Sequence, residues 1–233
     1  MGEEPPRGPA LKQVLLLVEG HTEERFVKDV MVPWTAGMDL VLRPTILVTK
    51  VVKDGPNFKG GVSVFSKIES DWHRPIRTRG PAFVSTILEY YRLPVDTPGM
   101  NTRTQFDDPL DRATHIEREI RRHFREPDGF LPFLALHEFE AWLFSCPKTL
   151  PEVMIDTKNA AHFAAVCSTV LSPEYINERP GFAPSKRIKD LYPSYQKVLH
   201  GTTAAKRIGL ELMRAKCSHL DNWLTQLEQF AST

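Results

Sequence analysis

The sequence predicts an α/β fold: a mostly parallel sheet sandwiched by helices, with a helical C-terminal region. Short apolar runs such as VLLLV (14–18) are typical of buried parallel strands, and they alternate with amphipathic helical segments. Beyond about residue 147 only helical patterns recur. We therefore expect an α/β core over 11–146, a helical region over 147–233 packed on that core, and a disordered, Pro-rich N-terminus over 1–10.

The first strand stops at Glu19-Gly20, and Thr22 is predicted to be the N-cap of a helix that ends near Pro33. The elements expected next are a strand region (39–52, bent at Pro44), a loop (54–61), a helix (62–71), a basic connector (73–81), a strand (82–91), a helix from Asp108 or Asp111 to Phe124, a strand (130–136), a turn into a helix (137–144), and C-terminal helices (158–170, 185–191, 202–216, 218–231). Trp223 and its apolar neighbours at helical spacing are expected in the core.

Composition excludes several classes of protein. The three Cys residues are far apart, which argues against a zinc ribbon or a disulfide framework. No run approaches the roughly 20 apolar residues that span a bilayer, so we expect a cytoplasmic protein with no membrane association. The P-loop, G-x-S-x-G and dinucleotide signatures are missing. The net charge of +1 neither supports nor excludes nucleic-acid binding.

Acidic residues follow three of the predicted strands. They are Glu19 with Glu23 one helical turn later, Glu89, and Glu138 with Glu140. The carboxyl ends of parallel strands meet at one edge of a sheet, and carboxylates that converge there repel one another unless a cation lies between them. Oxygen ligands favour Mg²⁺ or Mn²⁺, which could stabilise both the attacking and the leaving oxygen of a phosphodiester. We expect His137 to orient a ligand or a water molecule.

For most of these acids a purely structural role stays open as an alternative. Glu23 and Glu24 could serve only the dipole of their helix, and Glu138 and Glu140 could do the same for theirs. Glu19 has no evident structural role, because it follows five apolar residues and precedes a Gly turn.

Basic residues fall in clusters. His73, Arg74, Arg77 and Arg79 form one; Arg118, Arg121, Arg122, His123 and Arg125 form another; Lys186 and Arg187 follow Ser185 at a predicted helix start. Such clusters are usually solvated faces, but beside an acidic metal site they could contact phosphates. We take Arg74, Arg77, Arg79, Lys186 and Arg187 as candidate nucleic-acid contacts. Lys186 opposes the dipole of its helix, which favours a functional role in neutralising transition-state charge.

The stretch VLLLVEGHTEERFV resembles the opening signature of TOPRIM domains. More closely, the whole chain resembles the TOPRIM-like family catalogued as domain of unknown function 4276. The matching stretches are VEGHTEERFVKDVMVP (18–33), STILEYYRLPVDTPG (85–99), LHEFEAWLFS (136–145), APSKRIKDLYPSYQK (183–197) and IGLELMRAKCSHLDNWL (208–224).

This resemblance implies a TOPRIM-like fold, nuclease-type activity and a separate ABC- or SMC-type ATPase partner in bacterial defence. In the related overcoming-lysogenization-defect (OLD) nucleases, the first Glu and an acid four residues later bind metal, and these correspond to Glu19 and Glu23. The D-x-D motif after the third strand here reads Glu89-Tyr90-Tyr91, so the second acid is missing. Glu138 or Glu140 could supply it, and Lys186 resembles the catalytic lysine of those nucleases.

We therefore expect a Mg²⁺- or Mn²⁺-dependent nuclease, acting on DNA more readily than on RNA. The missing second acid favours one alternative, a degenerate TOPRIM module that binds and regulates an ATPase without cutting. Another is a different TOPRIM enzyme, such as a topoisomerase, for which Tyr90 and Tyr91 are the nearest candidate tyrosines. The sequence leaves open whether the chain forms a homo-oligomer.

Overall fold

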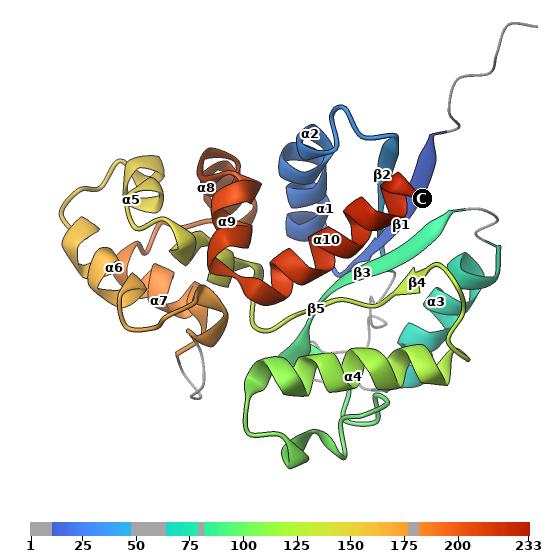
Figure 1. Cartoon of the computed structure of the whole chain (residues 1–233). Coiled ribbons are helices and arrows are strands. Elements are labelled where there is room, and N and C mark those ends of the chain that lie inside the picture. Colours follow the sequence, from blue (N-terminus) through green and yellow to red (C-terminus); the bar gives the residue numbers. More distant parts are fainter. Residues whose placement is uncertain (1–10, 48–63, 79–81, 177–181) are drawn as a thin grey trace, which may run out of the picture.

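The computed structural model describes residues 11–47, 64–78, 82–176 and 182–233 (Figure 1). Its centre is a parallel sheet in the order β2-β1-β3-β4, with β5 also paired to β3. The strands are β1 (Lys12–Val18), β2 (Leu40–Ile46), β3 (Phe83–Glu89), β4 (Phe130–Leu131) and β5 (Leu134–Ala135). The predicted α/β class, with its parallel sheet and helical C-terminal region, is confirmed.

The α-helices are α1 (His21–Phe26), α2 (Val32–Trp34), α3 (Phe65–Thr78), α4 (Pro109–His123), α5 (Thr149–Met154), α6 (Ala160–Cys167), α7 (Pro184–Leu191), α8 (Thr202–Ile208), α9 (Leu210–Lys216) and α10 (Ser218–Ser232). The π-helical turns are η1 (Val27–Met31) and η6 (Lys197–Gly201). The 3₁₀ turns are η2 (Tyr90–Arg92), η3 (Arg103–Gln105), η4 (Phe139–Ser145) and η5 (Pro173–Tyr175). Within these described residues, no helix is long and apolar enough to cross a membrane.

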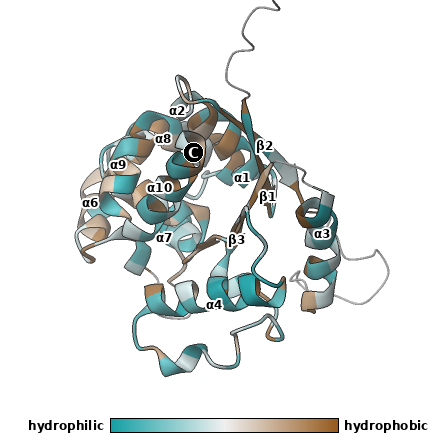
Figure 2. Ribbon diagram, turned by 45° about the vertical axis from the view of Figure 1, so that its right-hand side comes forward, coloured by the Kyte–Doolittle hydropathy of each residue, from teal (hydrophilic) through white to brown (hydrophobic). Residues whose placement is uncertain are grey.

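Helices cover both faces of the sheet, because residues on the two faces of β1 are buried in two different hydrophobic cores. Val14, Leu16 and Val18 point into one hydrophobic core with α1 and the C-terminal helices, whereas Leu17 points into a second core with α3 and α4. Figure 2 shows brown, hydrophobic residues along much of β1 and β3, and a mixture of brown and teal, polar residues along the helices. Burial on both faces explains why β1 is apolar throughout most of its length.

The C-terminal helix α10 packs across the sheet and ends beside the start of β1 (Figure 1). The indole Nε1 of Trp223 donates to Ser85 Oγ in β3 at 2.8 Å, and Lys12 Nζ donates to the carbonyl of Phe230 at 2.9 Å. The ring of Trp223 stacks on Phe133 with centroids 4.3 Å apart. Trp223 is thus a core residue, as predicted.

Several predicted boundaries are wrong. Thr22 is not the N-cap, because α1 begins at His21 and Gly20 occupies the cap position. The connector expected from residue 73 is helical as far as Thr78, since Trp72 and Ile76 bury one face of α3 despite Pro75. The strand predicted over 130–136 is divided into β4 and β5, and α5 was not predicted. The segment 1–10, the loop 54–61 and Arg79 lie outside the described residues.

Candidate active site: carboxylates around Lys197

The candidate site lies where the strand order of the sheet changes direction. The chain passes from β1 to β2 on one side and later to β3 on the other side, so β1 and β3 are the neighbours at this switch point. Val18 is paired with Ile87, which places Glu19 and Glu89 just beyond the paired ends of the two strands. The backbone N–H of Glu89 donates to Glu19 Oε2 at 3.3 Å. The two carboxylates therefore meet at the carboxyl edge of the sheet.

Three further elements complete the cluster. Glu23 comes from the first turn of α1, Glu140 from η4, and Lys197 from the start of η6. The ammonium of Lys197 lies 3.0 Å from Glu89 Oε1, 3.1 Å from Glu140 Oε2 and 3.8 Å from Glu23 Oε1. Tyr195 donates its hydroxyl hydrogen bond to Glu140 Oε1 at 3.5 Å. One lysine is thus shared by three buried carboxylates.

Arg92 supplies a second cation at the outer side of the cluster. Its Nε lies 2.7 Å from Glu89 Oε2, and its Nη1 lies 3.4 Å from Glu19 Oε1. Glu19 is the most accessible acid of the cluster, with 28% of its side chain exposed, compared with 3% for Glu89 and 0% for Glu140. The site therefore has a buried floor and opens toward solvent at Glu19 and Arg92.

Burial dominates the electrostatics of the acids. It raises the pKa of Glu23 and Glu89 above the ordinary value, although Lys197 offsets part of the effect. It raises the pKa of Glu140 to about 7, again against the attraction of Lys197. Burial alone would lower the pKa of Lys197, but the acids around it raise that pKa instead. Four carboxylates face two cations here, so the cluster retains an excess of negative charge when fully ionised.

Glu138 lies next to this cluster and already has partners. Its Oε2 accepts the backbone N–H of Ser185 at 2.7 Å, at the start of α7. Burial favours the protonated acid, but hydrogen bonds from Ser185 and from the Tyr91 hydroxyl outweigh it and lower the pKa of Glu138. Glu138 therefore caps α7 rather than its own helix, and it joins α7 to the segment that follows β3.

The lysine at the site is Lys197, which sequence reasoning did not single out. Lys186 is exposed on α7, one residue beyond Ser185, whose backbone N–H donates to Glu138. The role in neutralising transition-state charge that the sequence predicts for Lys186 stays a prediction. In the sequence, Lys197 is marked only as the last residue of the family-like stretch APSKRIKDLYPSYQK (183–197).

His137 does not take part in the cluster within the part of the chain that the structure describes. Burial lowers the pKa of His137 to about 4, so the ring is neutral near pH 7. The ring contacts the backbone of Glu174, and its Nε2 is buried without a hydrogen-bond partner among the described residues. These contacts favour a structural role for His137.

The donor chemistry suits a hard divalent cation, since every acidic ligand offers oxygen. Glu89 Oε2 and Glu140 Oε2 are buried and contact the cations without accepting a well-aligned hydrogen bond from the described residues. However, no group of three or more His, Cys, Asp or Glu side chains among those residues is arranged to hold a metal ion. The ammonium of Lys197 lies among these carboxylates instead, so a divalent ion would have to displace it.

Arg77, one of the predicted nucleic-acid contacts, lies away from the carboxylates. Arg77 and Arg125 line an open cavity of about 780 Å³ between α3 and the end of α4, together with His73 and His123. Glu69 Oε1 lies 2.7 Å from Nε2 of His123 and 3.4 Å from Nε2 of His73. This basic groove lies toward the start of β3, since Gly129 just beyond α4 accepts a hydrogen bond from the backbone of Val84. It therefore lies at the amino-terminal end of β3, whereas Glu19 and Glu89 lie at the carboxyl ends of their strands. Arg74 is exposed on α3 and Arg187 is half-buried on α7.

The comparison with family models agrees with the resemblance to domain of unknown function 4276. A family model described as "Domain of unknown function (DUF4276)" matches residues 18–228. The chain belongs to this family. Every member of the carboxylate cluster in this DUF4276 chain lies inside the matched range.

Among solved structures, the DUF4276 chain is similar to the C-terminal region of the Burkholderia pseudomallei OLD protein. The two are 13% identical, with a TM-score of 0.45, and the alignment covers 94% of this chain and 98% of that chain. No curated protein matches the sequence.

Proposed function

We propose that this DUF4276 chain is a Mg²⁺- or Mn²⁺-dependent TOPRIM-type nuclease that cleaves nucleic-acid phosphodiesters. The observation that carries the proposal is the meeting of Glu19 and Glu89 at the switch point of the sheet, with Glu23 and Glu140 on the same side. Buried acids that outnumber their cations are costly unless a further cation can bind. The family resemblance supports the proposal as well, because Glu19 and Glu23 correspond to metal-binding acids of OLD nucleases and Glu89 corresponds to the first acid of their D-x-D motif.

Glu19, Glu23, Glu89 and Glu140 would hold the ion, with Glu138 held beside them by Ser185. A bound divalent ion supplies charge stabilisation for the attacking and leaving oxygens of the phosphodiester. Glu19, the most exposed acid, is placed to accept a proton from the attacking water. Lys197, released from the carboxylates, would neutralise charge that develops on the phosphate, and Arg92 at the rim would anchor a phosphate oxygen.

The biological setting follows from the family resemblance alone. We propose that the chain acts on DNA in preference to RNA, as the effector of a bacterial anti-phage system together with a separate ABC- or SMC-type ATPase. The basic groove at the far edge of the sheet would then hold distant phosphates of a long substrate.

A cleavage assay tests this function. The full chain, alone and with its ATPase partner supplied, is incubated with plasmid DNA, with single-stranded DNA and with RNA in Mg²⁺, Mn²⁺ or EDTA. We expect cleavage that requires a divalent ion and falls at least about 100-fold in Glu19→Gln. Glu24→Gln is the matched control, because Glu24 lies on the same helix but pairs with Lys28 at the surface. Intact substrates in every wild-type reaction would refute the nuclease.

The position of Lys197 favours a second candidate function, that of a regulatory module that cuts nothing. An ammonium that remains bound to Glu23, Glu89 and Glu140 offsets part of their charge without a metal and occupies the space among them. Calorimetric titration with Mn²⁺ separates the two functions. A saturable site that Glu89→Gln abolishes supports the nuclease, and the lack of any binding supports the regulatory module.

A further inference from the structure

A second cavity opens beside the carboxylates, on the side of the loop that follows β3. Its volume is about 390 Å³, within the roughly 300–1,000 Å³ typical of small-ligand sites. The lining residues are Tyr90, Tyr91, Met100, Arg103, Thr104 and Arg112. We call this cavity the tyrosine pocket. It contains aromatic rings and guanidinium groups, and none of the described residues that line it is an acid.

Tyr91 forms the wall between the tyrosine pocket and the carboxylates. Tyr90 and Tyr91 follow Glu89 directly in the chain, so the pocket begins where the candidate active site ends. The hydroxyl of Tyr91 donates a hydrogen bond to Glu138, which points the residue toward the cluster, yet 43% of Tyr91 remains exposed. The guanidinium of Arg92 lies 6.0 Å from the centre of the Tyr91 ring. A ligand in the pocket would therefore lie next to any phosphate held at Arg92.

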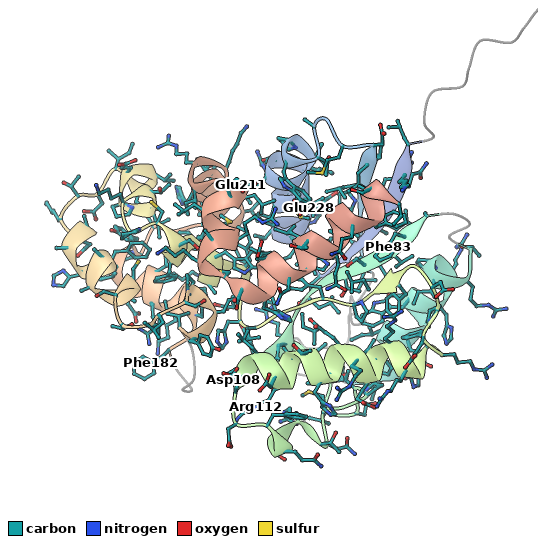
Figure 3. The ribbon with its side chains drawn as sticks, viewed as in Figure 1. Phe83, Asp108, Arg112, Phe182, Glu211 and Glu228 are labelled. Carbon is teal, nitrogen blue, oxygen red and sulfur yellow. The ribbon has the colours of Figure 1, made fainter. Side chains whose placement is uncertain are left out.

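The arginines of the pocket are held in place by the backbone. Arg112 donates from Nε to the carbonyl of Phe106 at 2.7 Å and from Nη2 to that of Asp107 at 2.9 Å. Arg103 donates from Nη1 to the carbonyl of Met100. These bonds are to neutral groups, so neither arginine has its charge paired with an acid among the described residues. Figure 3 shows Arg112 and the N-cap residue Asp108 at the beginning of α4, where the pocket lies.

An aromatic face beside unpaired guanidinium groups recognises a nucleotide, because a base stacks on the ring and a phosphate binds the cation. A base inside a duplex cannot use such a wall, since both of its faces are already stacked on neighbouring bases. The basic groove between α3 and α4 differs in this respect, because it has cations that suit phosphates of any nucleic acid.

We propose that the tyrosine pocket binds one unpaired nucleotide next to the scissile phosphate, so that the substrate is single-stranded nucleic acid or an unpaired segment of a duplex. This inference rests on the proposed nuclease function, whose site it extends. The base stacks on Tyr91, and Arg103 and Arg112 contact the flanking phosphates.

A binding experiment without cleavage tests the pocket separately from the nuclease. Fluorescence anisotropy is measured with a labelled single-stranded oligonucleotide and with its duplex, in EDTA and in Ca²⁺. Tyr91→Leu should weaken single-strand binding about tenfold and duplex binding less than twofold. Tyr91→Phe keeps the ring and should bind within about twofold of wild type. Arg43→Gln, an exposed charge on β2, is the control for non-specific loss of charge.

Each result decides one point. Equal weakening of single-strand and duplex binding by Tyr91→Leu, or tighter binding of the duplex by wild type, would overturn the pocket. Cleavage of single strands that is unchanged in Tyr91→Leu would overturn it too, while leaving the nuclease intact. If wild type binds single strands but shows no metal-dependent cleavage, the nuclease function is overturned and the pocket is not. Thermal unfolding by circular dichroism checks that each variant is folded.

Discussion

Lys197 Nζ lies 3.0 Å from Glu89 Oε1, although the two residues are 108 positions apart in the chain. The contact joins the C-terminal helical region to the end of the third strand. It also fixes the charge balance of the candidate site, because Glu23 and Glu140 use the same ammonium. The helical region is thus part of the site and more than a support for the sheet.

Replacing Lys197 with Met should destabilise the chain without metal by about 3–5 kcal/mol, because the change leaves buried carboxylates without their cation. The free energy of unfolding is measured in urea with EDTA and again with Mn²⁺. Added Mn²⁺ should stabilise Lys197→Met more than wild type, since the ion no longer competes with the ammonium. Lys189→Met, at an exposed position of α7, is the control. Equal gains from Mn²⁺ in both proteins would contradict competition at this site.

Gly201 in η6 lies against the tyrosine that holds Glu140. A Cβ atom at this position would lie 2.5 Å from the hydroxyl of Tyr195 and 3.2 Å from Phe139 Cε1. Its backbone is helical, so only the lack of space opposes a side chain. Gly201→Ala should therefore reduce the free energy of unfolding by about 1–3 kcal/mol.

A double-mutant cycle tests the cause. Tyr195→Phe removes the clashing oxygen, so Gly201→Ala should be better tolerated in that background than in wild type. Additive effects of the two changes would show that the clash with the hydroxyl is not the source of the loss.

The sequence predicted the sheet and the acids at its edge because both depend on local features. Five apolar residues before Glu19 identify a buried strand, and parallel strands bring their carboxyl ends to one edge. The contact between Glu19 and Glu89 then follows, because β1 and β3 are neighbours in the sheet. Their catalytic roles stay predictions.

Features that depend on tertiary packing were missed. Lys197 reaches the acids only after the C-terminal helices pack beside α1, and no local pattern encodes that contact. The predicted strand 130–136 breaks at Pro132, where the hydroxyls of Ser85 and Thr86 donate to the carbonyls of Leu131 and Phe133. Those side-chain bonds replace ladder bonds that periodicity alone would have implied.

His219 should make stability depend on pH. Burial opposes its charge, but Glu117 at 2.9 Å outweighs burial and raises the pKa of His219 above 6.5. A raised folded-state pKa gives a contribution that is complete below pH 6.5 and is lost as pH rises through the raised value. His219→Phe keeps the ring that stacks on Phe133 and removes the ion pair.

Urea unfolding of wild type and His219→Phe across pH 5.5–9 (about the range of interest for a histidine) measures this effect. The variant should be less stable by about 1.5–3 kcal/mol at the acidic end, and the difference should shrink toward the basic end. His162→Phe, at an exposed site on α6, should show no such trend. A difference that grows with pH would mean that the sign assigned to His219 is wrong.

Arg125 combines an unfavourable backbone with a place in the basic groove. It follows the C-cap of α4 with a φ of 65°, a left-handed conformation that glycine adopts more easily. Arg125→Gly should therefore raise the free energy of unfolding by about 0.5–1 kcal/mol. If the groove holds phosphates, the same variant should bind duplex DNA more weakly and with a shallower salt dependence, because one cation is lost. Anisotropy titrations over a range of salt concentrations measure the slope, and Arg125→Lys should restore most of it. A stabilised variant with unchanged DNA affinity would show that the groove does not contact the substrate.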